Sequence, residues 1–258
     1  MHAICDDLLD EHADLDAIVA DLDEQQWSQA TPAAGWSVRD QISHLWFFDQ
    51  RAALAMSDPD GFAADMQQLL AAGGTAASVE PGRAISGAEL LAAWRRDRSA
   101  LVSLARSIDP AARVPWYGPA MGARSFITAR LMETWAHGQD VADALSVRRA
   151  PTARLRHVAH LGVRARPFSY AVRGLTMPPV PVHVSLTAPD GSLWEWDEPV
   201  DDWVRGSALD FCLVATQRRH PADTGLQVHG PAATEWIGIA QAFAGGVGEG
   251  RRPGQFAR

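Results

Sequence analysis

The sequence feature that most constrains the fold is a change of hydrophobic period near residue 177. Before it, apolar side chains recur every three or four residues, as in amphipathic helices; after it, over 180–186 and 193–196, they alternate with polar residues. Turn-forming residues at 189–192 separate the two alternating runs, and the pattern predicts a β-hairpin. A helical part followed by a mixed part, over 258 residues in all, indicates two domains and the α+β class.

The first part contains four long helical stretches. Two of them begin at Ser37 and Ser86, each followed three residues later by an acidic residue, which is the capping-box pattern of a helix N-terminus. A shorter helix at about 60–72 and a Gly-rich loop separate the second and third long helices. Four helices with one long connection are the parts of a four-helix bundle. The long stretches are expected at about 3–26, 37–56, 86–108 and 125–145, with Ser125 or Thr128 opening the last.

An Arg-rich helical stretch at about 152–173 follows, and we expect it to pack outside the bundle or to lead away from it. Gly-rich sequence after Ala244 predicts a flexible tail. We therefore expect a helix bundle over 1–165 and a small α+β domain with a flexible Gly/Arg-rich tail over 166–258. Besides the hairpin, the small domain is expected to contain a helix at about 206–217, a strand at 226–229 and a helix opened by Pro231.

The charged residues exclude several chemistries. All 23 basic residues are arginine, so a lysine Schiff base, a phosphate-loop lysine and a lysine general base are impossible. The formal net charge is −8, and an acidic chain is a poor binder of polyanions. We therefore expect no nucleic-acid partner.

Two cysteines, Cys5 and Cys212, lie far apart and form no metal or redox motif. A disulfide framework is therefore not indicated. The N-terminal residues show no basic and apolar targeting pattern, and no run of about 18 apolar residues occurs. We expect a cytoplasmic protein with no membrane partner.

The strongest chemical pattern is a pair of ligand-type residues on the fourth long helix. Glu133 and His137 are four residues apart and so share one helix face. His44, on the second long helix, lies in an apolar stretch, and bundle cores build metal sites from such side chains on facing helices. Two histidines and one glutamate form a divalent-metal set that leaves a coordination position open, as in catalytic zinc sites.

The segment Gly35-Trp36-Ser37-Val38-Arg39-Asp40-Gln41-Ile42-Ser43-His44-Leu45, followed by Glu133-x-x-x-His137-Gly-Gln-Asp140, resembles the DinB-like metal-binding bundles. Within them it is most similar to the mycothiol-dependent maleylpyruvate isomerases, over about residues 5–165. The resemblance implies that His44, Glu133 and His137 hold a divalent metal, usually zinc, which binds the thiol of a low-molecular-weight cofactor. Sequence at 227–231 and 239–245 is similar to a small appended domain sometimes labelled after tRNA wyosine-base formation.

The function expected from these features is attack of a zinc-activated thiol, mycothiol, on a small organic substrate, giving an isomerase or a thiol transferase. Asp140 and Asp40 are expected to orient the histidines, with Asp140 alternatively contacting the cofactor. An arginine of the small domain is expected to bind a carboxylate of substrate or cofactor, the candidates being Arg205, Arg218 and Arg219. Two alternatives remain open, a metal-hydroxide hydrolase that needs no thiol and a non-catalytic metal- or small-molecule-binding protein. The sequence does not indicate an oligomeric state.

Overall fold

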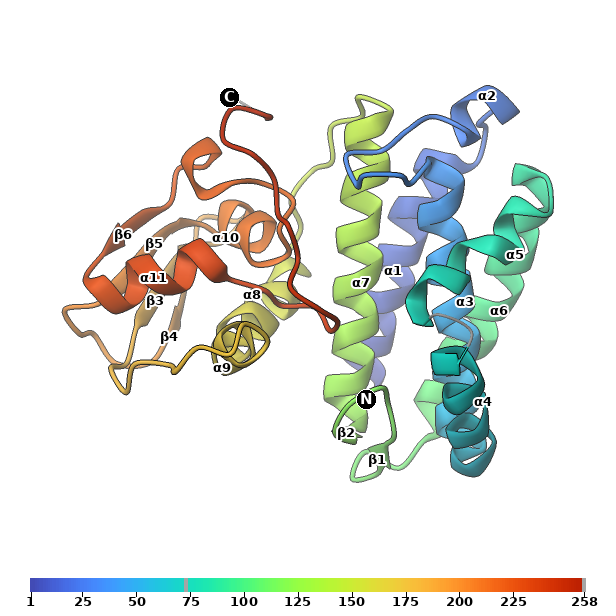
Figure 1. Ribbon diagram of the computed structural model, residues 1–258, viewed down its shortest axis with the longest axis horizontal. Coiled ribbons are helices and arrows are strands. Elements are labelled where there is room, and N and C mark those ends of the chain that lie inside the picture. The colour runs from blue at the N-terminus through green and yellow to red at the C-terminus, as the bar shows by residue number, and fades with distance from the viewer. Residues whose placement is uncertain (72–73, 257–258) are drawn as a thin grey trace. The chain divides into compact units, whose positions relative to one another are not determined.

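The computed structural model describes residues 1–71 and 74–256 and divides into two compact units, 1–149 and 150–258 (Figure 1). The first unit is helical and the second combines helices with a sheet, so the expected α+β class is confirmed. The boundary lies earlier than the expected residue 165. The reason is that α8 (Leu155–Arg164) packs against α10 (Ala208–Ala215) of the second unit, closely enough that a Cβ on Gly162 would overlap Phe211.

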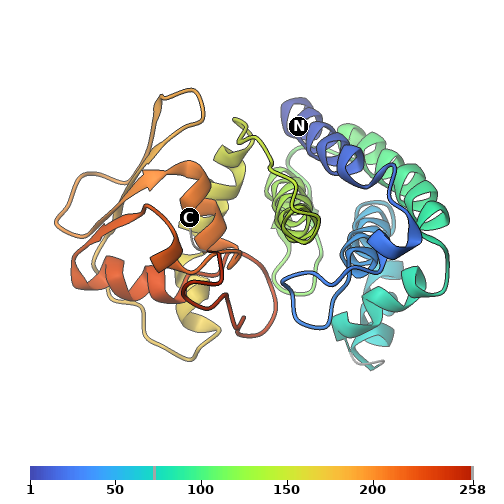
Figure 2. The same ribbon diagram turned by 90° about the horizontal axis from the view of Figure 1, so that it is seen from above.

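Four helices form the bundle of the first unit: α1 (His2–Val19), α3 (Val38–Ser57), α6 (Gly87–Ser107) and α7 (Ala123–Ala144). Helices α1 and α3 each pack against both α6 and α7, so the four surround one core. Figure 2 shows α3 and α7 nearly end-on. The buried apolar side chains of the four helices include Leu15, Val19, Val38, Ile42, Leu45, Leu90, Leu91, Trp94 and Val141.

The capping boxes predicted at the starts of α3 and α6 are confirmed. Ser37 and Asp40 exchange side-chain and backbone hydrogen bonds, as do Ser86 and Glu89. Each cap satisfies backbone N–H groups that a helix start leaves without partners, which stabilises it by about 1 kcal/mol. Because the cap at Ser37 sets where α3 begins, it also helps to set which of the following residues face the core.

Two other helix boundaries differ from the prediction. The first helix ends at Val19, and α2 (Glu24–Trp27) is a separate short helix, because Asp23 forms its own capping box with Gln26. Helix α7 begins at Ala123, before both expected start residues. Thr128 is inside the helix, where its hydroxyl donates to the backbone carbonyl of Arg124.

In the connection between α3 and α6, helical turns follow the predicted short helix where the sequence predicts a Gly-rich loop. The connection contains the predicted short helix, α4 (Pro59–Ala71), and then η1 (Gly74–Val79) and α5 (Glu80–Arg83), all packed against α3. The buried hydroxyl of Ser43 holds this segment, because it donates to the carbonyl of Ser78 and accepts from the backbone N–H of Gly82. Before α7, β1 (Arg113–Val114) and β2 (Met121–Gly122) pair in a small antiparallel ladder.

The second unit is built on a four-stranded sheet of order β4-β3-β5-β6. The predicted hairpin is confirmed, since β3 (His183–Thr187) and β4 (Leu193–Trp196) pair antiparallel with Leu186 opposite Trp194. The strand β6 (Gln227–His229) was predicted, but β5 (Trp203–Ser207), which pairs parallel to β3, was not. Helix α10 therefore begins after this strand, at Ala208.

The remaining elements of the second unit are helical. The Arg-rich stretch forms α8 and α9 (Arg166–Ala171), which are separated at Ala165. A turn, η2 (Pro221–Asp223), precedes β6, and α11 (Pro231–Ile239) begins at Pro231 as predicted. The chain beyond α11 is held by hydrogen bonds rather than loose: the Gln241 N–H donates to Ser169 Oγ, the Gln241 side chain bonds backbone groups of Gly246 and Gly248, and Asp223 accepts from the N–H of Gly254. In the described residues, none of the helices has the length and apolarity needed to cross a membrane.

Candidate metal centre

The three residues singled out as metal ligands converge in the bundle. His44 is on α3, Glu133 and His137 are on α7, and these two helices pack against each other. One ligand atom from each side chain lies within 4.8 Å of the other two. The imidazole rings of His44 and His137 have their centroids 4.5 Å apart, and Glu133 Oε2 is 3.3 Å from His137 Nε2. Helical spacing therefore places Glu133 beside His137, and the packing of α3 against α7 brings His44 to them, as the sequence predicts.

The site is partly open. His137 is buried, while the side chain of Glu133 is 21% exposed and His44 is partly buried. Two imidazole nitrogens and one carboxylate supply three ligands, which is one fewer than a closed tetrahedral zinc site has. A divalent ion fits this donor set, and it would keep a coordination position for an external ligand.

Gln41 contacts the imidazole of His137, which the sequence interpretation did not foresee. Gln41 lies on α3, and its Oε1 is 2.5 Å from His137 Nδ1. Metal-binding histidines commonly donate the N–H of their second ring nitrogen to such an acceptor, which fixes the ring and leaves the other nitrogen for the metal. The contact could not be found from sequence, because it joins two helices whose rotation about their axes is set only by packing.

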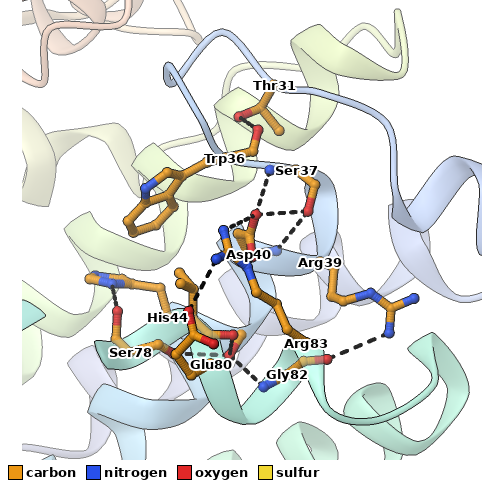
Figure 3. Close-up of polar contacts among 12 residues, drawn as sticks. Thr31, Trp36, Ser37, Arg39, Asp40, His44, Ser78, Glu80, Gly82 and Arg83 are labelled. Atoms are coloured by element: carbon orange, nitrogen blue, oxygen red, sulfur yellow. Dashed lines mark hydrogen bonds and ion pairs between the residues drawn. The ribbon is translucent and has the colours of Figure 1, made fainter. Parts of the chain in front are cut away.

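Ser78 contacts the other imidazole. Its Oγ lies 2.9 Å from His44 Nδ1, and the pair is shown in Figure 3. Ser78 is fully buried at the end of η1, in the segment that Ser43 ties to α3. The Gly-rich segment that was expected to be a loop therefore places the hydroxyl of Ser78 against the candidate ligand His44.

The described contacts of Asp40 are with Ser37 and Arg83, and its expected role in orienting His44 stays a prediction. Its carboxylate accepts from Ser37 at the start of α3 and pairs with Arg83 of α5, with 2.7 Å between Arg83 Nε and Asp40 Oδ1 (Figure 3). Burial raises the pKa of this carboxyl, but the hydrogen bonds from Arg83 and Ser37 together hold it below its ordinary value. These bonds give Asp40 a part in joining α5 to the start of α3, and they lend no support to a role at His44.

The other predicted site residues keep their roles as predictions. Asp140 is buried on α7, one turn beyond His137. In the second unit, Arg205 is exposed on β5 with its guanidinium over the ring of Trp203. The Nη1 atoms of Arg218 and Arg219 instead donate to backbone carbonyls.

Aromatic side chains adjoin both imidazoles. The ring of Trp36 stacks on His137 at 5.9 Å between centroids and lies 5.1 Å from His44. Phe48 contacts His44 from one turn further along α3, at 4.7 Å between centroids. Trp116 and Tyr117 pack on Phe48, and burial raises the pKa of the Tyr117 hydroxyl to about 12. The candidate metal centre therefore has apolar walls on two sides.

A four-helix bundle with two histidines and a glutamate on facing helices defines a class of metal-binding bundle proteins, and comparison with known proteins identifies the family. Residues 8–142 match the mycothiol maleylpyruvate isomerase N-terminal domain, and the chain belongs to this family. The resemblance inferred from the motif is thus confirmed. The matched segment ends before the second unit, so the resemblance proposed for residues 227–245 stays a prediction.

The chain is also similar to uncharacterized relatives and to solved structures. Two uncharacterized proteins of Mycobacterium tuberculosis, from different strains, are each 46% identical over 249 residues, covering 95% of this chain and 96% of theirs. The crystal structure of the mycothiol-dependent maleylpyruvate isomerase matches with a TM-score of 0.61 at 13% identity, over 90% of this chain and 95% of that chain. A histidine-to-alanine mutant of that enzyme matches with the same TM-score at 12% identity. At such identities the two structures show a shared fold.

Proposed function

We propose that this protein is a divalent-metal-dependent enzyme, with zinc as its metal, that activates mycothiol for attack on a small organic electrophile. The observation that carries the proposal is the convergence of His44, Glu133 and His137 within 4.8 Å. Membership of the mycothiol maleylpyruvate isomerase family supports the choice of thiol. The products distinguish two forms of the activity: release of the thiol gives an isomerase, and its retention gives a thiol transferase.

The charge and number of the ligands explain why a thiol suits the site. A divalent cation held by two neutral imidazoles and one carboxylate keeps a net positive charge, and so it favours the thiolate form of a thiol in its open position. The residues around the ligands hold them in place: Gln41 fixes one imidazole, and Ser78 contacts the other. The rings of Trp36 and Phe48 exclude water from the flanks of the site.

Two further assignments belong to this proposal. Asp140, one turn beyond His137 on α7, either orients the imidazole of His137 or contacts the cofactor. An arginine of the second unit binds a carboxylate of substrate or cofactor, and the candidates are Arg205, Arg218 and Arg219.

The test is a turnover assay on the zinc-loaded chain with a panel of activated alkenes, epoxides and esters, with and without mycothiol. We expect turnover that requires both zinc and thiol, and analysis of the product separates isomerisation from transfer. Turnover with zinc alone would instead establish a hydrolase. Stoichiometric zinc binding with neither turnover nor thiol affinity would establish a binding protein.

A further inference from the structure

A chain of hydrogen bonds runs from a backbone carbonyl to the imidazole of His137. Thr31 Oγ1 donates to the carbonyl of Trp36 at 2.9 Å. Gln41 Nε2 donates to Thr31 Oγ1 at 2.9 Å, and Gln41 Oε1 faces His137 Nδ1. The chain thus joins the loop before α3, helix α3 itself and helix α7.

The direction of every bond in this chain follows from its first member. A carbonyl oxygen only accepts, so the single hydroxyl proton of Thr31 is used on Trp36. The Thr31 oxygen must then accept from Gln41, which turns the NH₂ group of the amide toward Thr31 and its oxygen toward His137. An amide oxygen also only accepts, so His137 Nδ1 must carry a proton.

The consequence falls on the other ring nitrogen. In a neutral imidazole with the proton on Nδ1, Nε2 presents a lone pair. His137 Nε2 is the atom that lies 3.3 Å from the Glu133 carboxylate, at the point where the three candidate ligands meet. The lone pair is therefore directed at the position a cation would take.

The contact at His44 is of another kind. Its Nδ1 faces the hydroxyl of Ser78, which can donate or accept, so this contact by itself is compatible with either tautomer.

We propose that Thr31 and Gln41 are positioning residues that set the tautomer of His137, with the Trp36 carbonyl fixing the direction of the chain. The inference rests on the proposed function in one respect, which is that the site binds a metal ion. Thr31 acts on His137 through Gln41, and in this way it makes His137 a ready metal ligand. The same chain holds the loop that places the Trp36 ring against both imidazoles.

The tautomer is measured by nitrogen-15 NMR of the full chain labelled at histidine, without metal and at a pH where imidazoles are neutral, with a His137→Gln variant to assign the signals. We expect a proton on Nδ1 of His137 in the wild type and in Thr31→Ser, which keeps the hydroxyl. Thr31→Val, which keeps the shape but removes the hydroxyl, is expected to give a mixture of tautomers. A wild-type His137 with its proton on Nε2 would overturn the proposal.

Zinc affinity, measured by competition with a chelator, provides a second readout. We expect Thr31→Val to weaken binding about tenfold, and the matched control Thr128→Val, at a buried threonine inside α7, to leave it unchanged. Gln41→Glu is expected to bind zinc at least as tightly as the wild type, because a carboxylate only accepts and so also holds the proton on Nδ1.

The outcomes separate this inference from the proposed function. Two outcomes would overturn the role of the hydrogen-bond chain while leaving the metal site intact. One is a Thr31→Val variant with wild-type affinity and a single tautomer, and the other is a Gln41→Glu variant that binds zinc as weakly as Thr31→Val. A wild type that binds no zinc would overturn the metal site, and the tautomer of the metal-free protein would still test the chain.

Discussion

Asp49 on α3 and Arg130 on α7 form an ion pair inside the bundle, with 2.9 Å between Asp49 Oδ1 and Arg130 Nη2. Both side chains are almost completely buried, and the indole N–H of Trp94 on α6 donates to the second carboxylate oxygen. The pair joins the two helices that carry the candidate metal ligands. It therefore contributes to fixing how far one helix is displaced along the other.

Removing one partner of this pair is expected to be costly. Asp49→Ala leaves the guanidinium of Arg130 buried without its counter-charge, and we expect the free energy of unfolding of the bundle to fall by about 3–5 kcal/mol. The double variant Asp49→Leu with Arg130→Met is expected to lose less, because it removes both charges. Urea denaturation measures both values.

The matched control for this prediction is a more exposed ion pair of the same bundle. The side chain of Arg95 is 47% exposed and pairs with the partly buried Asp16, which keeps Arg98 as a second partner, so Arg95→Ala is expected to cost about 0–1 kcal/mol. A cost for Asp49→Ala no larger than that for Arg95→Ala would show that the buried pair does not stabilise the packing of α3 against α7.

His12, on α1, gives the bundle a pH dependence. Burial lowers its pKa from 6.5 to about 4, although the nearby Asp49 carboxylate raises it. Between these pH values the unfolded chain binds a proton at His12 that the native state does not, so stability decreases as the pH falls from 6.5 towards 4. The contribution lost is roughly 3 kcal/mol, at about 1.4 kcal/mol for each pH unit.

The variant His12→Leu isolates this contribution. We expect the unfolding free energy of the wild type to fall more steeply than that of His12→Leu between pH 6.5 and 4, whereas the two slopes coincide above pH 7. Parallel curves over the whole range would mean that the native bundle does not lower the pKa of His12.

Gly82 is expected to be essential for seating the segment that carries Ser78. A Cβ at this position would lie 2.4 Å from the Cβ of Ser43, so Gly82→Ala must displace α5 from α3. We expect a loss of about 1–3 kcal/mol together with weaker zinc binding, because Ser78 moves away from His44. Gly118→Ala, where a Cβ meets nothing within 4 Å, is the control for both measurements. Unchanged zinc affinity in Gly82→Ala would show that Ser78 does not support the site.

Metal binding is expected to stabilise the bundle by mass action. Zinc at a hundred times its Kd should raise the free energy of unfolding by about 2.7 kcal/mol, and a chelator should reverse the gain. Thermal denaturation measures the shift in Tm. In Glu133→Gln the carboxylate ligand is replaced by a neutral amide, and we expect most of the shift to be lost. A shift of the same size in this variant would place the stabilising ion elsewhere.

The sequence predicts the bundle well because its signals are local. Hydrophobic periodicity and the capping boxes at Ser37 and Ser86 act within one helix, so they define the starts of α3 and α6 without knowledge of the fold. The pairing of Glu133 with His137 is equally local, since four residues make about one helical turn. His44 was recognised as the third candidate ligand from the apolar stretch around it and from the family motif.

The features that sequence reasoning missed depend on contacts between distant segments. Gln41 and Ser78 reach the histidines across 96 and 34 residues of chain respectively, and no spacing rule applies to such pairs. The strand β5 was missed because its five residues include Gly206 and do not alternate cleanly; pairing with β3 and β6 creates it. The break after Val19 was missed because the apolar period continues across it, while the Asp23 cap starts a new helix.

The metal centre is tested most directly by titrating zinc into the metal-free chain in a calorimeter. We predict that the wild type binds one zinc ion per chain, that His44→Ala and His137→Ala bind none at the same concentrations, and that His157→Ala, which removes none of the three candidate ligands, behaves as the wild type. A wild type that takes up no zinc, or histidine variants at positions 44 and 137 that take up as much as the wild type, would contradict the assignment.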